Sequence, residues 1–379
     1  MKTGPTQVFK FERSRPDLEK FRTGVSLHSH TMHSREYLHR LPQYISRVPI
    51  ASYMIEREVG RVHLYAGTVV NFRKVFWTPP LSAREALELE RGQIERQLGM
   101  RGLVSLSDHD NVEAGLHLRM LQGMDSVPVS VEWSVPYEQT VFHLGIHNLP
   151  AASANSWMME LAKFTAKPSS KRLRELFREL NAERSVLVIL NHPYWDAESI
   201  GPEQHIASLE SFLKKNAFWI HALELNGLRS RRENQKVLKL GEETGLLVIS
   251  GGDRHGCEPN ATLNVTNAET FNEFVDEIRR ERRSEIVLMP QYFDRLQLRL
   301  LESAWHAMSD APGEFGRRHW MTRVFHEAED GKARPLSSFL GPKFERFVEP
   351  FRRIMGMLAS PQFRPALRLA LGGSEEAGL

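Results

Sequence analysis

The fold is decided by a short stretch near the amino terminus, GVSLHSH at residues 24–30, in which a β-rich run ends in two histidines separated by one residue. Similar runs that end in polar turns recur along the chain, at 24–27, 102–106, 127–131, 140–146, 185–190, 218–225, 245–250 and 285–289. Apolar runs of this length, separated by helical segments, are typical of buried parallel strands. The pattern therefore predicts a sheet whose strands end in polar, often histidine-bearing turns.

Amphipathic helical patterns lie between several of these runs. Residues 81–98 predict a helix in which Ser82 is the N-cap and Glu85 stands three residues further on, which is the spacing of a capping box. Residues 169–180 and 267–282 each carry an apolar stripe at helical spacing. Strands that alternate with helices indicate an α/β repeat, either a barrel or a doubly wound sheet.

Three segments depart from this alternation. Residues 35–80 are far longer than an ordinary βα loop of about two to six residues, so we expect an inserted lid. Residues 291–379 carry helical patterns at 296–305 and 344–358, which core packing or a homodimer contact would use. Residues 1–20 are expected to be charged and irregular.

Composition restricts the class of protein. Hydrophobic residues make up 41% and charged residues 26%, which are ordinary globular values. No run reaches the roughly 18 apolar residues of a membrane helix, and the amino terminus lacks the apolar centre of a signal peptide. The single Cys257 excludes a disulfide framework, and a net charge of +3 does not by itself indicate a nucleic-acid-binding protein. We expect a soluble, cytoplasmic protein with no membrane partner.

The polar residues at the ends of the runs are of the metal-ligand type. His28 and His30 have the i, i+2 spacing that places side chains on one side of an extended chain, and Asp253 and His255 repeat it. Between these pairs, also at the ends of runs, stand Asp108, His109, Glu132, His143 and His192.

The order of the set is more informative than any member. Alone, a His-x-His pair is often two surface histidines, Asp253 could cap a helix, and His143 could be a core histidine. In a barrel, however, the carboxyl ends of the strands meet on one face. Six histidines, one glutamate and two aspartates on that face would form a polynuclear site that activates water and clamps phosphoryl oxygens. The scarcity of cysteine favours Mn, Fe or Zn bound by nitrogen and oxygen.

This ordered set resembles the polymerase-and-histidinol-phosphatase (PHP) superfamily, through the motifs SLHSH, GLVSLSDHD, VPVSVEWS, FHLGIH, LNHPYWD, ALELNG and ISGGDRH. The resemblance implies a distorted (β/α)7 TIM-like barrel at residues 21–290, with 35–80 as an inserted lid and 291–379 as a helical extension. It also implies hydrolysis of a phosphate ester by metal-bound hydroxide at a centre of two or three divalent ions. The positions that match family ligands are His28, His30, His109, Glu132, His143, His192, Asp253 and His255.

The chain departs from the family pattern at two places. Ser26 stands where the family has an aspartate, and Arg35 and Glu36 stand where it has an aspartate or a histidine. Glu36 is either an oxygen ligand or a solvated residue at the start of the insertion; without it, two ions are expected instead of three. Asp108 is expected in the catalytic site as a ligand or as a carboxylate that orients a ligand histidine, and removal of His192 is expected to abolish turnover.

Substrate contacts are expected from two arginines. Arg35 could contact a phosphate through its guanidinium fork or be solvated, and Arg254 is more readily explained by a structural salt bridge. The insertion also interleaves basic and aromatic residues that could stack bases, although packing of the lid is favoured. These are Arg47, Arg57, Arg61, Arg73 and Lys74 with Phe72, Phe76 and Trp77. Tyr194, Trp195 and Glu224 flank the site.

The resulting hypothesis is a metal-dependent hydrolase that acts on a small phosphorylated metabolite or nucleotide, with nucleic acid as a less favoured substrate. An amidohydrolase-like reaction on a non-phosphate substrate is the first alternative. That chemistry commonly uses a lysine at a strand end, and these motifs contain none. A catalytically silent PHP-type binding module is the second alternative, although such a module should have lost ligands.

Overall fold

The computed structural model describes most of the chain. The described residues are 6–12, 16–39, 42, 53, 56–57, 59–60, 70–310, 319–328, 330–338, 342–360 and 362–370. Among them, no helix combines the length and the apolar character needed to cross a bilayer.

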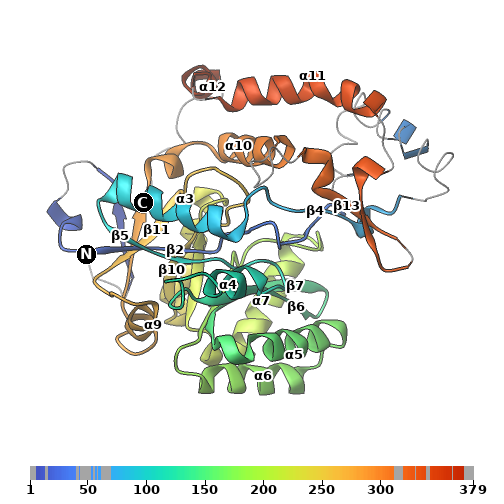
Figure 1. Ribbon diagram of the computed structural model, residues 1–379. Coiled ribbons are helices and arrows are strands. Elements are labelled where there is room, and N and C mark those ends of the chain that lie inside the picture. The colour runs from blue at the N-terminus through green and yellow to red at the C-terminus, as the bar shows by residue number, and fades with distance from the viewer. Residues whose placement is uncertain are drawn as a thin grey trace.

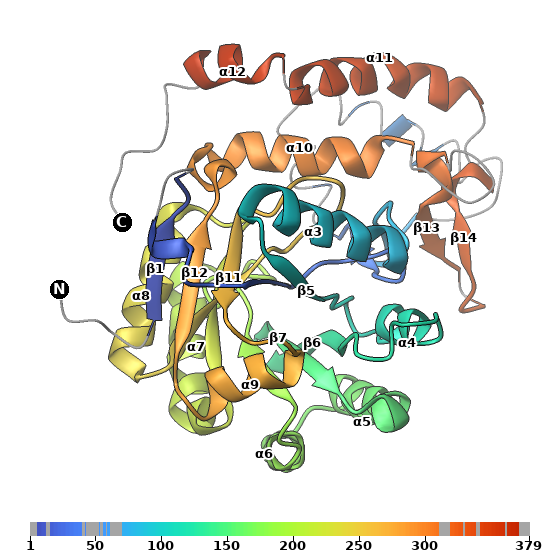
Figure 2. The ribbon, with the colours of Figure 1, turned by 60° about the vertical axis from the view of Figure 1, so that its left-hand side comes forward.

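Two five-stranded sheets form the centre of the molecule. Figures 1 and 2 show strands in the middle of the molecule with helices around them. The first sheet has the order β1 (Thr6–Lys10), β12 (Ser284–Leu288), β11 (Thr262–Thr266), β2 (Thr23–Leu27) and β5 (Arg101–Ser105). The second has the order β10 (Leu247–Gly251), β9 (Ala222–Asn226), β8 (Leu187–Leu190), β7 (Thr140–Leu149) and β6 (Val129–Tyr137). The protein is therefore of the mixed α/β class that the strand-and-helix alternation predicted.

Helices cover the outer faces of these sheets. They are α3 (Ala83–Leu98), α4 (Glu113–Arg119), α5 (Ala154–Ala166), α6 (Ser170–Ala182), α7 (Pro202–Asn216), α8 (Arg231–Thr244) and α9 (Phe271–Arg279). The capping box predicted for α3 is confirmed, because Ser82 accepts from the backbone of Glu85 and the Glu85 carboxylate accepts from the backbone of Ser82. The two other predicted helices are present as α6 and as the shorter α9. Apolar side chains between the layers, such as Trp133 and Phe177, are fully buried.

The expectation of parallel strands throughout is wrong. β6, β7 and β8 pair antiparallel, and β11 pairs antiparallel with both β2 and β12. The cause at β6 and β7 is a two-residue turn at Glu138 and Gln139, where Glu138 takes a left-handed φ of 53°. Such a turn can join only antiparallel neighbours, whereas parallel strands need a long crossover.

The two sheets meet at two isolated bridges. Ser29, after β2, bridges to Arg254, after β10, and His109, after β5, bridges to Glu132 on β6. The described residues thus form two bridged sheets, and a single closed barrel is not seen. The bridges nevertheless bring the ends of β2, β5 and β10 together beside β6, and this is where the candidate ligands lie. Glu132 and His143 lie inside β6 and β7, so the expectation that they stand at strand ends is wrong.

Two strands of the large sheets, β1 and β11, were not predicted from the sequence. β1 lies in the segment expected to be irregular, yet it pairs in parallel with β12 along its whole length. β11, TLNVT, alternates polar and apolar residues, so it lacks the continuous apolar run used to find strands. The side chain of its Asn264 accepts from the backbone of Ser250 at 2.8 Å and donates to the carbonyl of the same residue at 2.9 Å.

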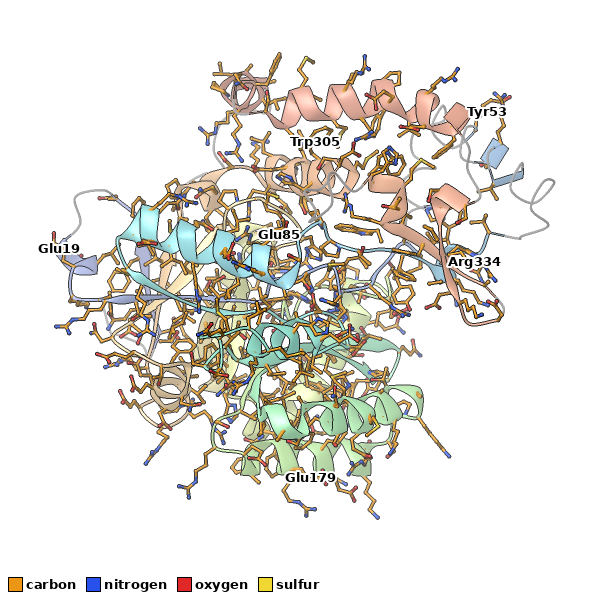
Figure 3. All side chains as sticks on the ribbon, in the orientation of Figure 1. Glu19, Tyr53, Glu85, Glu179, Trp305 and Arg334 are labelled. Atoms are coloured by element: carbon orange, nitrogen blue, oxygen red, sulfur yellow. The ribbon has the colours of Figure 1, made fainter. Side chains whose placement is uncertain are left out.

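A third sheet joins the insertion to the C-terminal extension. Its order is β14 (Ala333–Pro335), β13 (Val324–Glu327), β4 (Val75–Trp77) and β3 (Glu36–Tyr37), all antiparallel, and we call it the cap sheet. Figure 3 places Arg334 of β14 at the outer edge of this sheet. Phe76 stacks on Phe325 with ring centroids 5.3 Å apart, so this aromatic residue of the insertion packs within the sheet. Arg47 and Arg61 lie outside the described residues.

The C-terminal extension also contains three helices, α10 (Leu296–Met308), α11 (Pro342–Ala359) and α12 (Arg364–Ala370). In Figures 1 and 2, α10 and α11 lie side by side above the two large sheets. Gly356 of α11 lets the ring of Trp305 on α10 approach, because a Cβ there would lie only 2.7 Å from it (Figure 3). The helical patterns at 296–305 and 344–358 are confirmed as helices.

Candidate metal centre

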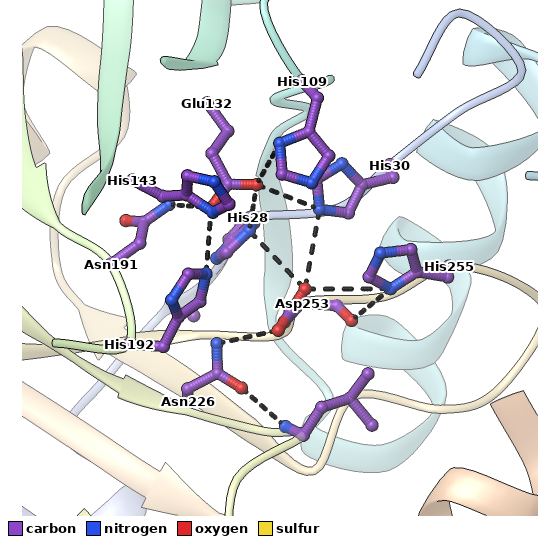
Figure 4. A network of polar contacts seen from close by, with 12 residues as sticks. His28, His30, His109, Glu132, His143, Asn191, His192, Asn226, Asp253 and His255 are labelled. Atoms are coloured by element: carbon purple, nitrogen blue, oxygen red, sulfur yellow. Dashed lines mark hydrogen bonds and ion pairs between the residues drawn. The ribbon is translucent and has the colours of Figure 1, made fainter. Parts of the chain in front are cut away.

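The predicted ligands converge where the two large sheets meet (Figure 4). His28 and His30 follow β2, and Asp253 and His255 follow β10. The remaining side chains come from β6, β7, the ends of β5 and β8, and the cap sheet: Glu132, His143, His109, His192 and Glu36. The structure thus brings all nine predicted ligand residues into one cluster.

The backbone reaches this arrangement through left-handed residues. His28, His192 and Asp253 have positive φ values of 62°, 25° and 53°. His28 and His30 do lie together, as predicted, but the predicted reason is wrong. They are not neighbours on an extended strand, because β2 ends at Leu27 and the chain turns at His28 itself. A non-glycine residue with a left-handed backbone conformation lowers the stability of the folded state by about 1–3 kcal/mol, and such residues are concentrated at functional sites.

Glu132 is the centre of the cluster and has no exposed surface. Its Oε2 lies 3.0 Å from His28 Nε2, 3.2 Å from His109 Nδ1 and 3.4 Å from His30 Nε2. Its Oε1 lies 3.1 Å from His192 Nε2 and 3.4 Å from His143 Nδ1. One carboxylate therefore faces five histidines.

Asp253 forms the second acidic point of the cluster. Its Oδ1 lies 3.6 Å from the Nε2 atoms of both His28 and His30, and 3.7 Å from His255 Nδ1. Its Oδ2 accepts from Asn226 Nδ2 at 3.1 Å. The two carboxylates thus face the His28 and His30 rings from the two edge strands of one sheet, Glu132 from β6 and Asp253 from the end of β10.

Glu36 reaches the cluster from the cap sheet. Its Oε2 lies 3.3 Å from His255 Nε2 and 3.4 Å from His109 Nε2, and its Oε1 lies 3.7 Å from His30 Nδ1. Ser34 Oγ donates to Glu36 Oε1 at 2.6 Å. With a side chain only 13% exposed, Glu36 is not the solvated residue of the alternative interpretation.

The cluster has the donor set of a metal centre. Four overlapping groups each offer ligand atoms within 4.8 Å of one another: His30, Glu36, His109 and His255; His28, His30 and Glu132; His28, His192 and Asp253; and His109, Glu132 and His143. Several of these buried atoms make no hydrogen bond, namely His28 Nε2, His30 Nε2, His109 Nδ1, Glu132 Oε2 and His143 Nδ1. Buried polar atoms nearly always have hydrogen-bond partners. Buried nitrogen and oxygen atoms that point toward one another without such partners fit divalent metal ions.

Hydrogen bonds with residues outside the ligand set hold the ligand side chains in place. Glu224 Oε1 lies 2.5 Å from His28 Nδ1, and its Oε2 accepts from the backbone N–H of His192 at 2.8 Å. Asn191 donates to Glu132 Oε1 at 3.0 Å. A Cβ on Gly251 would overlap the Glu224 carboxylate, which explains the glycine in the ISGGDRH motif. Such contacts orient ligand rings and tune metal affinity.

Burial and mutual charge shift the protonation of the cluster. Burial opposes the charge of Glu132, but His28, His109 and His143 hold its pKa well below the usual value. Burial also lowers the pKa of His109, yet the carboxylates of Glu132 and Glu36 outweigh it and raise that pKa to about 10. In the same way, Glu36 raises the pKa of His255 to about 9 against the effect of burial. Without metal, both rings are therefore protonated at neutral pH.

Metal binding should therefore strengthen as the pH rises. His109 and His255 can bind a metal only as neutral rings, so each must lose a proton on binding. Each displaced proton makes the affinity rise about tenfold per pH unit below the pKa of that ring, here up to about pH 9. Mn²⁺ titrations at pH 6, 7 and 8 would measure this slope. An affinity that does not change with pH would contradict the protonation assigned to these rings.

Asp108 makes its hydrogen bonds with Thr31, and its expected part in the catalytic site stays a prediction. Its Oδ1 accepts from the backbone of Thr31 at 2.5 Å and its Oδ2 accepts from the Thr31 hydroxyl at 2.8 Å. It contributes to none of the ligand groups of the described residues and accepts from no ligand histidine. Burial raises its pKa to about 7. Asp108 fixes the turn that directly follows His30.

The two arginines expected at the substrate are in ion pairs. Arg254 is buried beside Glu90 of α3, with Nη1 and Oε1 3.4 Å apart, which agrees with the favoured structural interpretation. Arg35 pairs with Glu327 of β13 at 2.7 Å. Their contact with a substrate stays a prediction.

Arg229 was missed by the sequence analysis. Its Nη2 lies 3.5 Å from Asp253 Oδ2, and its guanidinium lies over the Trp195 ring, 4.6 Å from the centroid. Trp195 in turn stands perpendicular to the His192 ring with centroids 4.9 Å apart. The sequence could have indicated Arg229, because it follows β9 in ELNGLRS. A charged residue just beyond the end of a strand lies at the same edge of the sheet as the predicted ligands.

Comparison with known proteins places few constraints on the chain. No family model and no curated protein matches it. One similar solved structure is an amidohydrolase from Chromobacterium violaceum with bound sulfate and no metal, at 14% identity and a TM-score of 0.32, covering 47% of this chain and 84% of that one. Another is described as a metal-dependent phosphoesterase from Bifidobacterium adolescentis, at 15% identity and a TM-score of 0.33, covering 54% of this chain and 92% of that one. At these values neither similarity says what this chain does.

Proposed function

We propose that this chain is a metal-dependent phosphoesterase that hydrolyses a small phosphorylated metabolite or a nucleotide. The observation that carries the proposal is the set of overlapping ligand groups that share Glu132, His28, His30 and His109. Shared ligands keep neighbouring ions close, which is the arrangement that stabilises both the attacking and the leaving oxygen of a phosphoryl transfer. Two or three ions of Mn, Fe or Zn would fit this donor set.

The bound ions would supply Lewis acidity and lower the pKa of water, so that a nucleophile forms near neutral pH. The chain's own residues position this chemistry. Glu132 and Asp253 balance the positive charge from two sides, and Glu224 sets the orientation of the His28 ring. We further propose that the two bridged sheets are the halves of a distorted barrel whose strand ends form the site.

A phosphate ester is favoured over other substrates because of Arg229. Its Nη2 lies 3.5 Å from Oδ2 of the ligand Asp253, and its buried Nε makes no hydrogen bond but lies 3.8 Å from Oε1 of Glu233. A guanidinium offers paired donors that match phosphate oxygens, and the ring of Trp195 holds its plane. The amidohydrolase-like alternative commonly uses a lysine at a strand end, and the strand-end motifs of this sequence contain none.

Replacing Arg229 with lysine should lower kcat/KM for a phosphate ester by about 10- to 100-fold, the value of a charge-assisted hydrogen bond. Lysine keeps the charge but loses the planar fork and the stacking on Trp195. Metal content should be unchanged. The matched control is Arg280→Lys, because Arg280 is exposed on the end of α9 and pairs only locally with Asp276. Equal activity of the two variants would remove Arg229 from the proposed site.

The substrate class is tested by a screen of the Mn²⁺-loaded protein against phosphomonoesters, phosphodiesters, single-stranded oligonucleotides and simple amides. The proposal expects turnover of phosphomonoesters that is lost with chelator and regained with Mn²⁺. Turnover of amides alone would favour the amidohydrolase-like reaction. A metal-loaded protein that turns over none of them would favour a catalytically silent binding module.

A further inference from the structure

We propose that the C-terminal extension completes the metal centre, because it holds in place the strand that carries Glu36. Glu36 is the only ligand of its group that comes from the cap sheet, whereas His30, His109 and His255 follow strands of the two large sheets. An ion bound by this group would therefore fasten the cap sheet to the rest of the molecule. The inference rests on the proposed metal centre and not on the reaction that it catalyses.

The strand that delivers Glu36 cannot hold its position alone. β3 has only two residues, and each pairs with β4: Glu36 opposite Trp77 and Tyr37 opposite Phe76. The backbone N–H of Leu38 also donates to the carbonyl of Val75 at 2.8 Å. A two-stranded ribbon of this length is not stable in water, so β4 must itself be supported.

The C-terminal extension supplies that support through β13. Its Val324 and Phe325 pair opposite Trp77 and Phe76, on the edge of β4 that β3 does not use. The buried Arg323 then ties the end of β4 to α10: its Nη1 donates to the carbonyl of Thr78 at 3.0 Å and its Nη2 to that of Ala307 at 2.9 Å. The position of Glu36 therefore depends on residues nearly 300 positions away in the sequence. Arg35, next to Glu36, and Glu327 of β13 are 292 positions apart.

A side-chain tie reinforces the backbone pairing. Arg35, the neighbour of Glu36, pairs with Glu327 at the end of β13 at 2.7 Å. Its guanidinium lies over the Phe76 ring, 5.0 Å from the centroid, and Phe76 stacks on Phe325. Arg35 and Glu327 are thus positioning residues for Glu36.

Thermodynamic linkage makes the inference testable without any substrate. If the ordered cap sheet favours metal binding through Glu36, metal binding must stabilise the cap sheet by the same factor. Hydrogen–deuterium exchange of the full chain, with and without Mn²⁺, measures this directly. We expect slower exchange of β4 and β13 in the Mn²⁺-loaded protein. In Glu36→Gln, the same Mn²⁺ concentration should leave the exchange of β13 unchanged. Helix α6, which carries none of the ligand residues, is the internal control.

A second comparison tests the side-chain tie. Glu327→Gln should weaken the binding of one Mn²⁺ ion by about two- to fivefold, the range of an exposed ion pair, and leave the others unchanged. The charge exchange Arg35→Glu with Glu327→Arg should restore the affinity. Asp330→Asn is the matched control, because it removes an exposed ion pair with Arg334 at 2.7 Å on the same hairpin.

The inference is overturned if wild-type protein binds Mn²⁺ and the exchange of β13 does not slow. It is also overturned if Glu36→Gln retains every ion with full affinity. Neither readout uses phosphatase activity, so a failure of the proposed reaction leaves them intact. A wild-type chain that binds no metal would overturn the inference together with the metal centre.

Discussion

Glu132→Gln should lower metal-dependent turnover by more than about 100-fold and reduce the number of bound ions. The substitution keeps the size of the side chain and removes only the charge that faces five histidine rings. Loss of a residue that merely orients a ligand already costs about 10- to 100-fold, so loss of the shared carboxylate should cost more. Elemental analysis and phosphomonoesterase assays on the same preparation would measure both effects.

The control for this variant is Glu88→Gln. Glu88 is an exposed residue of α3 that pairs with Arg84 one helical turn away, so its replacement should change neither quantity. A Glu132→Gln protein that retains wild-type metal content and turnover would show that this carboxylate does not bind metal.

His192→Asn should abolish turnover, again by more than about 100-fold, while the protein remains folded. Asparagine is chosen because it tolerates the left-handed backbone that His192 adopts at a φ of 25°. The variant removes the Nε2 atom that lies 3.1 Å from Glu132 Oε1, and it keeps the backbone N–H that donates to Glu224. Circular dichroism and steady-state kinetics would separate folding from catalysis.

A buried histidine outside the centre provides the matched control. His221 is buried, and its Nδ1 accepts from the backbone of Val188 at 2.8 Å, without contact to any ligand residue. His221→Asn should lose about 1–3 kcal/mol of stability through the unsatisfied N–H and keep the turnover of each folded molecule. If the two variants lost activity in parallel with stability, His192 would be a structural residue only.

The ligand set could be predicted because its members are read from local patterns. His28 and His109 stand where a β-rich run gives way to a polar turn, and the ends of neighbouring strands share an edge. Glu132 and His143 were found by the same pattern but lie inside β6 and β7. What local patterns could not predict is backbone conformation. The left-handed φ of His28 and Asp253 breaks the alternation on which the spacing argument relied. Asp108 is adjacent in sequence to a ligand, but its side chain turns to Thr31.

The cap sheet was beyond sequence reasoning for another reason. Its strands have two to four residues, too few to show a period, and the pairing of β4 with β13 joins residues more than 200 positions apart, such as Trp77 and Val324. The insertion and the C-terminal extension therefore looked like separate additions, when in fact Phe76 and Phe325 pack together. β11 escaped notice because the buried side chains of Thr262 and Asn264 are polar and make hydrogen bonds inside the protein. Hydrophobicity alone does not reveal such strands.

The most direct test of the account is the metal content of the protein purified without chelator. We predict at least two equivalents of Mn, Fe or Zn per chain, because the convergent ligand groups share residues and present buried atoms that no hydrogen bond satisfies. After chelation, added Mn²⁺ should restore both the metal and the phosphomonoesterase activity. A chain that is isolated without metal, and that gains neither bound ions nor activity from Mn²⁺, would contradict the central claim.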